Sequence, residues 1–204
     1  MSDFKSNFWD ERYSFEEYVY GIEPNQFFKE QIDKFSSPGK LFLPGEGEGR
    51  NAVYAAKLGW QVDAFDQSIK AQEKALRLAK KNEMNINYQV TDLTKFYTEK
   101  NKYDAAAVIF VHFSSEERSV FHQRIIDSLK PGGKLILESF SKNQLGKSSG
   151  GPQNLEMLNS LEDIKNDFKE MRTILLEEKN VILNEGDKHK GEASVIGYVG
   201  EKVK

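Results

Sequence analysis

The sequence predicts an α/β fold: a doubly wound, seven-stranded and mostly parallel sheet with a C-terminal antiparallel hairpin and helices on both faces. Short strand-like runs alternate with helical patterns, and this spacing is typical of parallel strands joined by right-handed crossovers. Residues 105–111 form a continuous apolar run, which indicates a central strand covered on both faces. Two long strand-like runs, 171–184 and 193–202, flank the loop 185–191 and predict a hairpin at one edge of the sheet.

Each element follows from its local sequence. Strands are expected over residues 41–43, 61–65, 86–90, 105–111, 134–139, 171–184 and 193–202. Helices are expected near 8–15 and 25–35, and over 51–58, 68–82, 114–130 and 160–170. Pro24 introduces the second helix, Gly59 stops the third, Ser68 caps the fourth, and Pro131 with the two glycines after it ends the fifth.

The composition excludes several classes of protein. The 204 residues suit one domain, and with 38% hydrophobic and 12% aromatic residues the chain can build a core, so disorder is excluded as the main state. The absence of Cys excludes a disulfide scaffold, a thiolate nucleophile and a Cys-ligated metal. A net charge of −3 argues against nucleic acid as a partner. Without a secretory signal or a membrane-spanning run, we expect a cytoplasmic protein with no membrane partner.

A glycine-rich loop over residues 44–51, with the sequence PGEGEGRN, follows the first strand. Its glycines allow a sharp turn and close approach to a ligand, and the next helix offers free N–H groups to an anion such as a carboxylate. Asp66 ends the second strand, where it can accept hydrogen bonds from two ribose hydroxyls. A glycine loop, a helix and a terminal acid in one βαβ unit together predict a nucleoside-containing cofactor.

The loop's charge and spacing favour one cofactor over another. Glu46 and Glu48 would repel a pyrophosphate if they faced it, and the pattern is G-x-G-x-G rather than the dinucleotide pattern G-x-G-x-x-G. The ammonium and sulfonium of S-adenosylmethionine suit carboxylates better. Either glutamate could instead face solvent, and a nicotinamide-dependent oxidoreductase on a related fold and a non-catalytic S-adenosylmethionine-binding protein remain alternatives.

From residue 41 to residue 137 the chain resembles the class I S-adenosylmethionine-dependent methyltransferases, with a Rossmann-like fold. It is most similar to their small-molecule branch, which includes the tellurite-resistance and thiopurine methyltransferases. The similar segments, in order, are the loop 45–52, the strand end 62–68, the acid-containing turn 91–93, the strand 103–113 and the segment 129–137. The resemblance implies a single methyltransferase domain over 1–204, divided into an N-terminal helical lid (1–36), a cofactor-binding core (37–140) and a substrate-side loop, helix and terminal hairpin (141–204).

The expected cofactor contacts come from the loop, the strand ends and the lid. Aromatic faces in the lid would attract a sulfonium. The resemblance implies that Asp92 contacts the amino group of the cofactor's adenine. Many family members carry an acid at the position of Leu43 that binds the cofactor's ammonium, and Glu46 is the candidate to bind it in this chain. The predicted cofactor-binding residues are Trp9, Tyr13, Tyr20, Gly45, Glu46, Gly47, Asp66, Gln67, Ser68, Asp92, Leu93 and Phe110.

Methyl transfer from a sulfonium is an in-line displacement that depends mainly on positioning, and a base is needed only if the acceptor must lose a proton. The candidate catalytic residues are His112 and Glu138, which end the fourth and fifth strands, and His189, which is placed in the hairpin loop, where a solvated role is the default.

The expected partner is a small-molecule methyl acceptor, with oxygen, nitrogen, sulfur or a chalcogen oxyanion all open. Arg50, Phe140 and Gln144 are the predicted substrate residues, and the loop 140–152 is expected to cover the substrate. No metal is expected, because no acids cluster after the fourth strand.

Overall fold

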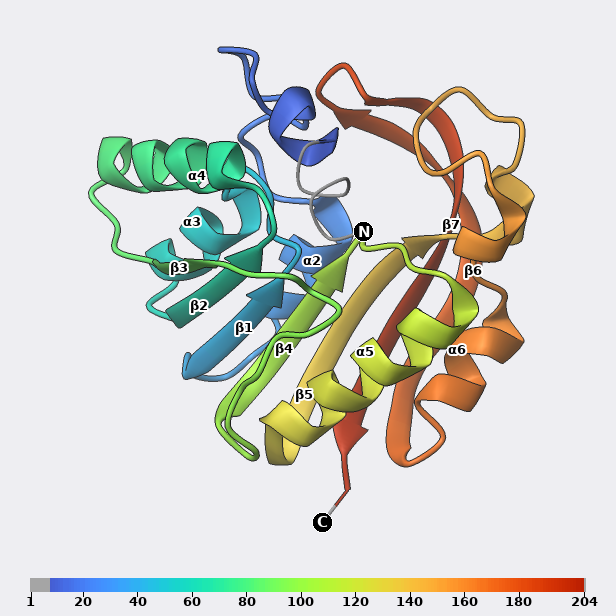
Figure 1. Ribbon diagram of the computed structural model, residues 1–204. Coiled ribbons are helices and arrows are strands. Elements are labelled where there is room, and N and C mark those ends of the chain that lie inside the picture. Colours follow the sequence, from blue (N-terminus) through green and yellow to red (C-terminus); the bar gives the residue numbers. More distant parts are fainter. Residues whose placement is uncertain (1–7, 204) are drawn as a thin grey trace.

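The computed structural model describes residues 8–203, so residues 1–7 of the predicted lid lie outside the described residues. Seven strands form one sheet in the order β3-β2-β1-β4-β5-β7-β6 (Figure 1). Neighbouring strands from β3 to β5 are parallel, and β7 is antiparallel to both β5 and β6. The strands are β1 (Lys40–Pro44), β2 (Gln61–Asp66), β3 (Asn87–Val90), β4 (Tyr103–Ile109), β5 (Leu129–Phe140), β6 (Met171–Glu185) and β7 (His189–Lys202). The predicted fold class is confirmed.

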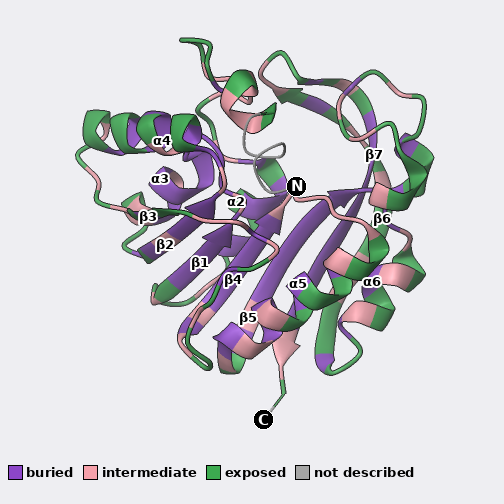
Figure 2. Cartoon of the chain, in the orientation of Figure 1, coloured by how far each residue is buried: buried purple, intermediate pink, exposed green. Residues whose placement is uncertain are grey.

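Helices cover both faces of this sheet. They are α2 (Gln26–Ile32), α3 (Arg50–Lys57), α4 (Ile69–Lys81), α5 (Ser115–Ser128) and α6 (Leu161–Asp167), with a helical turn at 8–12 and the 3₁₀ turns η1 (Lys142–Gln144) and η2 (Leu155–Met157). The inner strands of the sheet are largely buried, whereas the edge strands β3 and β6 and the outer faces of the helices are largely exposed (Figure 2). None of the helices among residues 8–203 is long and apolar enough to span a membrane.

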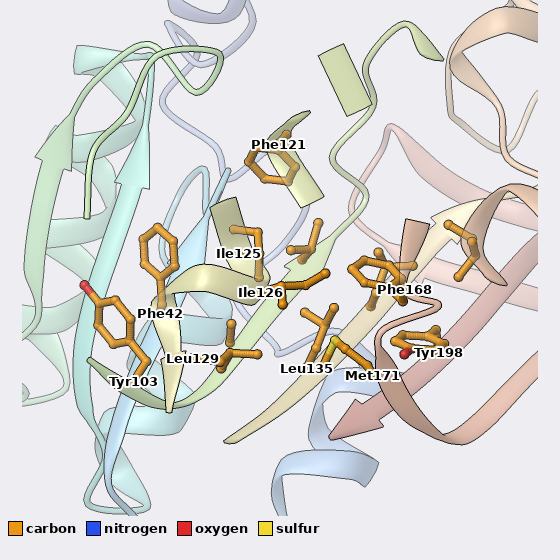
Figure 3. Packing of buried hydrophobic residues seen from close by; sticks show 14 of the residues in the cluster. Phe42, Tyr103, Phe121, Ile125, Ile126, Leu129, Leu135, Phe168, Met171 and Tyr198 are labelled. Atoms are coloured by element: carbon orange, nitrogen blue, oxygen red, sulfur yellow. The ribbon is translucent and has the colours of Figure 1, made fainter. Parts of the chain in front are cut away.

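The alternation of side chains along each strand builds two cores. On one face, Leu41 and Leu43 pack with residues of α2 and α3. On the other face, Phe42 lies in a cluster with Phe121 of α5 and Phe168, which directly follows α6 (Figure 3). Because successive residues of a strand point to opposite faces, one short apolar strand serves both layers. Helices can therefore pack on both faces of the sheet, as the predicted doubly wound fold requires.

Local sequence sets several boundaries as predicted. Ser68 is the N-cap of α4 and accepts the Ala71 N–H, and Ser160 forms a capping box with Asp163 at the start of α6. β4 ends at Ile109, earlier than predicted, because Phe110 has a φ of 53° and turns the chain out of the strand.

The hairpin differs from the prediction at its tip. The turn between β6 and β7 is short, because Gly186 has a φ of 69° and allows Glu185 to pair directly with His189. The placement of His189 in a loop over 185–191 was therefore wrong. His189 is the first residue of β7 and is buried.

Candidate active site

The glycine-rich loop connects β1 to α3 at the carboxyl edge of the sheet. Gly45, Gly47 and Gly49 all have positive φ angles, which L side chains rarely adopt. A Cβ atom on Gly47 would lie 2.8 Å from the hydroxyl of Tyr13, in the N-terminal segment. Glycine is therefore required at position 47 both by its backbone conformation and by its neighbour.

Asp66, the last residue of β2, is buried beside this loop. Its Oδ2 accepts the Gly47 N–H at 2.9 Å, and its Oδ1 accepts the Ser68 N–H at 3.0 Å. Burial raises the pKa of Asp66 to about 6, although these N–H groups favour the charged form. Each carboxylate oxygen has a second lone pair, so Asp66 keeps the capacity to accept hydrogen bonds from two hydroxyls.

The two glutamates of the loop have different environments. Glu46 accepts the Ala52 N–H at 2.7 Å near the start of α3, and burial raises the pKa of Glu46 to about 7. Glu48 forms a 2.5 Å ion pair with Lys74 of α4 and accepts the Tyr20 N–H at 3.3 Å. Glu48 therefore holds the loop, α4 and the N-terminal segment together.

Aromatic side chains of the N-terminal segment form one wall of the site. Trp9 stacks on Tyr13 with ring centroids 5.6 Å apart, and Tyr20 meets Tyr13 edge to face at 6.3 Å. Arg12 donates to the Tyr20 hydroxyl at 3.1 Å. The Tyr20 ring lies 4.5 Å from the ring of His189, so this wall continues into the C-terminal hairpin.

A second group of rings lies at the ends of β4 and β5. Phe110 and Phe140 stack at 4.5 Å with an interplanar angle of 23°, and the His112 ring lies 5.5 Å from Phe140 at 18°. His189 meets Phe110 edge to face at 4.8 Å. The positive φ of Phe110 places this bulky residue in a strained conformation, a feature that clusters at functional sites.

A buried ion pair closes the side of the site next to the hairpin. Arg50 donates to Glu185 at 2.9 Å and to the Tyr20 carbonyl at 3.2 Å, and the His189 Nδ1 lies 3.3 Å from the same Glu185 oxygen. Burial alone would raise the pKa of Glu185, but His189 and Arg50 hold it at about 2. The arginine is thus committed to protein partners.

These elements enclose a cavity of about 440 Å³, within the usual range for a small-molecule site. It brings together fourteen of the predicted site residues: Trp9, Tyr13, Tyr20, Gly45, Glu46, Gly47, Arg50, Asp66, Gln67, Leu93, Phe110, His112, Phe140 and His189. Among residues 8–203, no three His, Asp or Glu side chains form a group suited to a metal ion.

Three other predicted site residues are engaged in local structure outside this cavity. The Ser68 hydroxyl donates to Asp10 at 2.5 Å while it caps α4. Asp92 accepts both the N–H and the hydroxyl of Thr94, at 2.9 and 2.7 Å. The Gln144 amide donates to the Ser149 hydroxyl at 2.9 Å and so fixes the loop after β5.

Glu138 lies in β5, next to a second cavity of about 600 Å³ between the segment 20–27 and β6. Its Oε2 accepts from the Asn25 amide at 2.6 Å, and the same amide donates to Glu185 at 3.0 Å. Burial raises the pKa of Glu138 to about 7. The structure therefore separates Glu138 from the cavity that contains His112.

The 440 Å³ cavity is also lined by residues that were not among the predicted site residues, Phe113 and Met157 among them. The contact of Met157 could not be predicted from the sequence, because it is made by the backbone carbonyl, which every residue has. This carbonyl oxygen lies 3.1 Å from the Nδ1 of His112. Only the folding of η2 against the end of β4 brings these two residues together.

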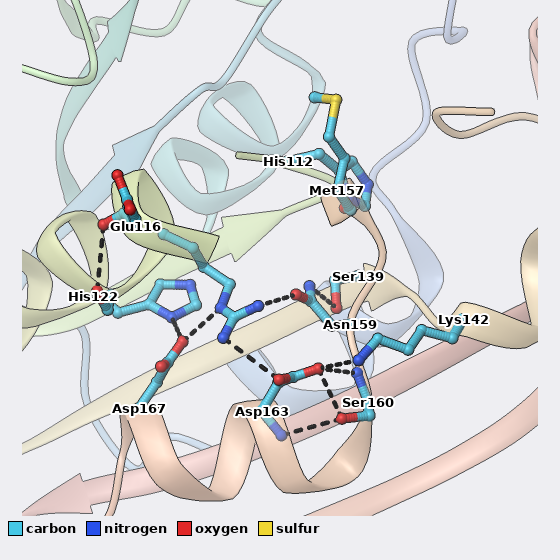
Figure 4. Close-up of polar contacts among 12 residues, drawn as sticks. His112, Glu116, His122, Ser139, Lys142, Met157, Asn159, Ser160, Asp163 and Asp167 are labelled. Atoms are coloured by element: carbon cyan, nitrogen blue, oxygen red, sulfur yellow. Dashed lines mark hydrogen bonds and ion pairs between the residues drawn. The ribbon is translucent and has the colours of Figure 1, made fainter. Parts of the chain in front are cut away.

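A polar network fixes the segment that contains Met157 (Figure 4). His122 Nδ1 lies 2.8 Å from the Asp167 carboxylate, which also accepts from Arg118 at 2.7 Å. Arg118 donates in addition to Asn159 at 3.2 Å, and Asn159 donates to the Ser139 hydroxyl at 3.1 Å. The network therefore links α5 and α6 to the strand end beside the cavity.

Residues 44–133 match the family model for a methyltransferase domain. No curated protein sequence matches the chain significantly. The fold is similar to a SAM-dependent methyltransferase from Aquifex aeolicus, with a TM-score of 0.62 and 17% identity over 86% of this chain and 89% of that one.

Two further neighbours are more similar in structure. TehB from Haemophilus influenzae has a TM-score of 0.73 and 16% identity, over 97% of this chain and 67% of that one. A protein solved in work on the conversion of a disulfide bond into a thioacetal group during echinomycin biosynthesis has a TM-score of 0.76 and 14% identity, over 98% and 92% of the two chains.

The strand order is that of a Rossmann-like methyltransferase fold, and residues 44–133 match a methyltransferase domain. Together these findings support a class I S-adenosylmethionine-dependent methyltransferase, which uses S-adenosylmethionine as its cofactor and releases S-adenosylhomocysteine.

Proposed function

We propose that this enzyme methylates a small molecule bound in the 440 Å³ cavity, with the cofactor between the glycine loop and the aromatic wall. The observation that carries the proposal is the convergence of Gly47, Asp66 and Tyr13 on one cavity at the carboxyl ends of the parallel strands. We further propose that the segment up to residue 36 acts as a lid and that the loop 140–152 covers the substrate.

The residues present fit this cofactor. Asp66 has free lone pairs for ribose hydroxyls, Glu46 offers a carboxylate for an ammonium, and the Tyr13 and Tyr20 rings offer faces to a sulfonium. S-adenosylmethionine supplies a methyl group activated by its positively charged sulfur. The chain's own residues then act by orienting the acceptor and excluding water.

Isothermal titration tests the cofactor assignment directly. We expect S-adenosylhomocysteine to bind with a micromolar dissociation constant and NAD(P) not to bind. Incubation with S-adenosylmethionine and a panel of small acceptors, followed by mass spectrometry, should then yield a methylated product. NAD(P) binding without S-adenosylhomocysteine binding would overturn the proposal. Cofactor binding without any methylated product would favour a non-catalytic binding protein.

Substitution of Gly47 by alanine should weaken S-adenosylhomocysteine binding by about tenfold or more, because the new Cβ would displace Tyr13. Gly146→Ala is the matched control, since Gly146 has a φ of +83° but nothing within 4 Å of a Cβ. Both variants should lose about 1–2 kcal/mol of stability from left-handed strain. Only Gly47→Ala should change the affinity measured by titration, and equal affinities in the two variants would contradict the expected contact.

A further inference from the structure

The position of His112 fixes the tautomer of its ring. Its Nδ1 lies 3.1 Å from the Met157 carbonyl oxygen, which can only accept a hydrogen bond. Nδ1 therefore carries the proton, and in the neutral ring Nε2 is left as an unprotonated acceptor. Burial lowers the pKa of His112 to about 4, so the ring stays neutral at physiological pH.

The Nε2 atom of His112 is buried and has no hydrogen-bond partner among residues 8–203. A buried acceptor without a donor loses its interaction with water and gains nothing in return, so native structures rarely retain one. Because His112 lines the cavity, the missing donor can come from a molecule bound there.

The segment that carries the Met157 carbonyl is fixed by hydrogen bonds. Met157 ends η2, and Asn159, two residues later, is bonded through both its backbone and its side chain (Figure 4). The Asn159 N–H donates to the Phe140 carbonyl at 3.2 Å, and its side chain bonds both Ser139 and Arg118. The carbonyl that holds Nδ1 is therefore part of the packed structure.

The surroundings of His112 define what else the bound molecule must present. The ring is stacked on Phe140, and Phe113, Pro152 and Met157 line the same cavity. Of the two arginines of the cavity, Arg50 pairs with Glu185, whereas Arg12 donates to the neutral Tyr20 hydroxyl. An anion without a proton placed beside Nε2 would meet a lone pair, whereas an O–H or N–H group would meet an acceptor. The surroundings of His112 therefore suit a flat, apolar body that carries a hydrogen-bond donor.

We propose that the methyl acceptor is a neutral aromatic or heteroaromatic molecule whose O–H or N–H group donates a hydrogen bond to His112 Nε2. This rests on the proposed function and specifies its substrate class. In the transfer, the acceptor's oxygen or nitrogen forms a bond to the methyl carbon, and the carbon–sulfur bond breaks with its electron pair left on sulfur. The acceptor's proton passes to Nε2 and then to solvent. An acceptor without a proton on its oxygen or nitrogen could not donate to Nε2 and would not fit this role.

Two substitutions separate this role from simple packing. His112→Phe keeps a flat ring on Phe140 but removes the acceptor, whereas His112→Gln removes the ring but keeps an amide that can donate to Met157 and accept from the ligand. We expect both to bind S-adenosylhomocysteine like the wild type. Methylation of phenols, hydroxyquinolines and indoles should fall at least tenfold in His112→Phe and less in His112→Gln. A packing role predicts the reverse order.

Nitrogen-15 NMR of the histidines provides a readout that does not depend on turnover. In the wild-type protein with S-adenosylhomocysteine bound, His112 should show a protonated Nδ1 and an unprotonated Nε2, and the reverse assignment would overturn the inference.

The acceptor panel separates failure of this inference from failure of the proposed function. Methylation confined to tellurite, selenite or thiols, or full activity of His112→Phe, would overturn the inference while the proposed function stands. If S-adenosylhomocysteine does not bind at all, the proposed function fails, and the tautomer measured on the free protein still decides the state of His112.

Discussion

Replacing Lys74 by methionine is expected to lower the free energy of unfolding by about 3–5 kcal/mol, because it leaves the buried Glu48 carboxylate without its cation. The side chains of this pair are only 4% and 2% exposed. The Lys74 ammonium also donates to the carbonyls of Phe15 and Glu17 at 2.8 and 2.6 Å and lies 5.1 Å from the Tyr18 ring. One side chain thus fastens the N-terminal segment to α4.

Urea denaturation of the variant and of a matched control measures this effect. Lys70 lies on the same helix, and its ion pair with Glu73 is about half exposed, so Lys70→Met should change stability by less than about 1 kcal/mol. The double variant Lys74→Met with Glu48→Gln should recover part of the loss, because the uncompensated charge is gone. Equal stability of Lys74→Met and Lys70→Met would show that the pair is not important for folding.

Replacing Asp66 by asparagine is expected to weaken S-adenosylhomocysteine binding by about 1–3 kcal/mol, the range for hydrogen bonds to a charged group. Asp63→Asn is the control, since Asp63 lies on the same strand but pairs with Tyr103 and Lys102 away from the cavity. Unchanged affinity in Asp66→Asn, measured by titration, would remove Asp66 from the cofactor site.

The same residue should make cofactor binding pH-dependent. Ribose hydroxyls donate to the ionised carboxylate, so binding favours the deprotonated form of Asp66. With a pKa of about 6, roughly one tenth of Asp66 is ionised at pH 5, so ionisation of Asp66 should contribute an about tenfold rise in affinity from pH 5 to pH 7.5, separate from the rise that ionisation of Glu46 contributes near pH 7. Titrations across this range should show that Asp66→Asn lacks the rise centred near pH 6.

Those parts of the site that depend on local sequence could be predicted. The glycine loop, the acid at the end of β2 and the Ser68 cap each follow from a short segment whose conformation is set by its own residues. The fold class was equally predictable, because the alternating strands and helices are adjacent along the chain.

The remaining parts depend on contacts between distant segments. Glu48 looked like a candidate ligand for a cationic cofactor, but its partner Lys74 lies on another helix. Glu138 was expected at the end of a strand, but it lies within β5, bonds to Asn25 and lines a different cavity. Met157 contributes only a carbonyl, which any residue could supply. Periodicity and motifs carry no information about such pairings.

The tip of the hairpin meets the N-terminal segment, since Tyr20 contacts His189 and its carbonyl accepts from Arg50, the partner of Glu185 (Figure 1). The N-terminal segment, the region that contains Arg50 and the C-terminal hairpin must consequently all be folded together before the cavity is enclosed. A nascent chain that has emerged from the ribosome only as far as β5 would hold the glycine turn and Asp66, but it would have no enclosed chamber. Ligand-binding competence should thus appear abruptly, once the final two strands have been added.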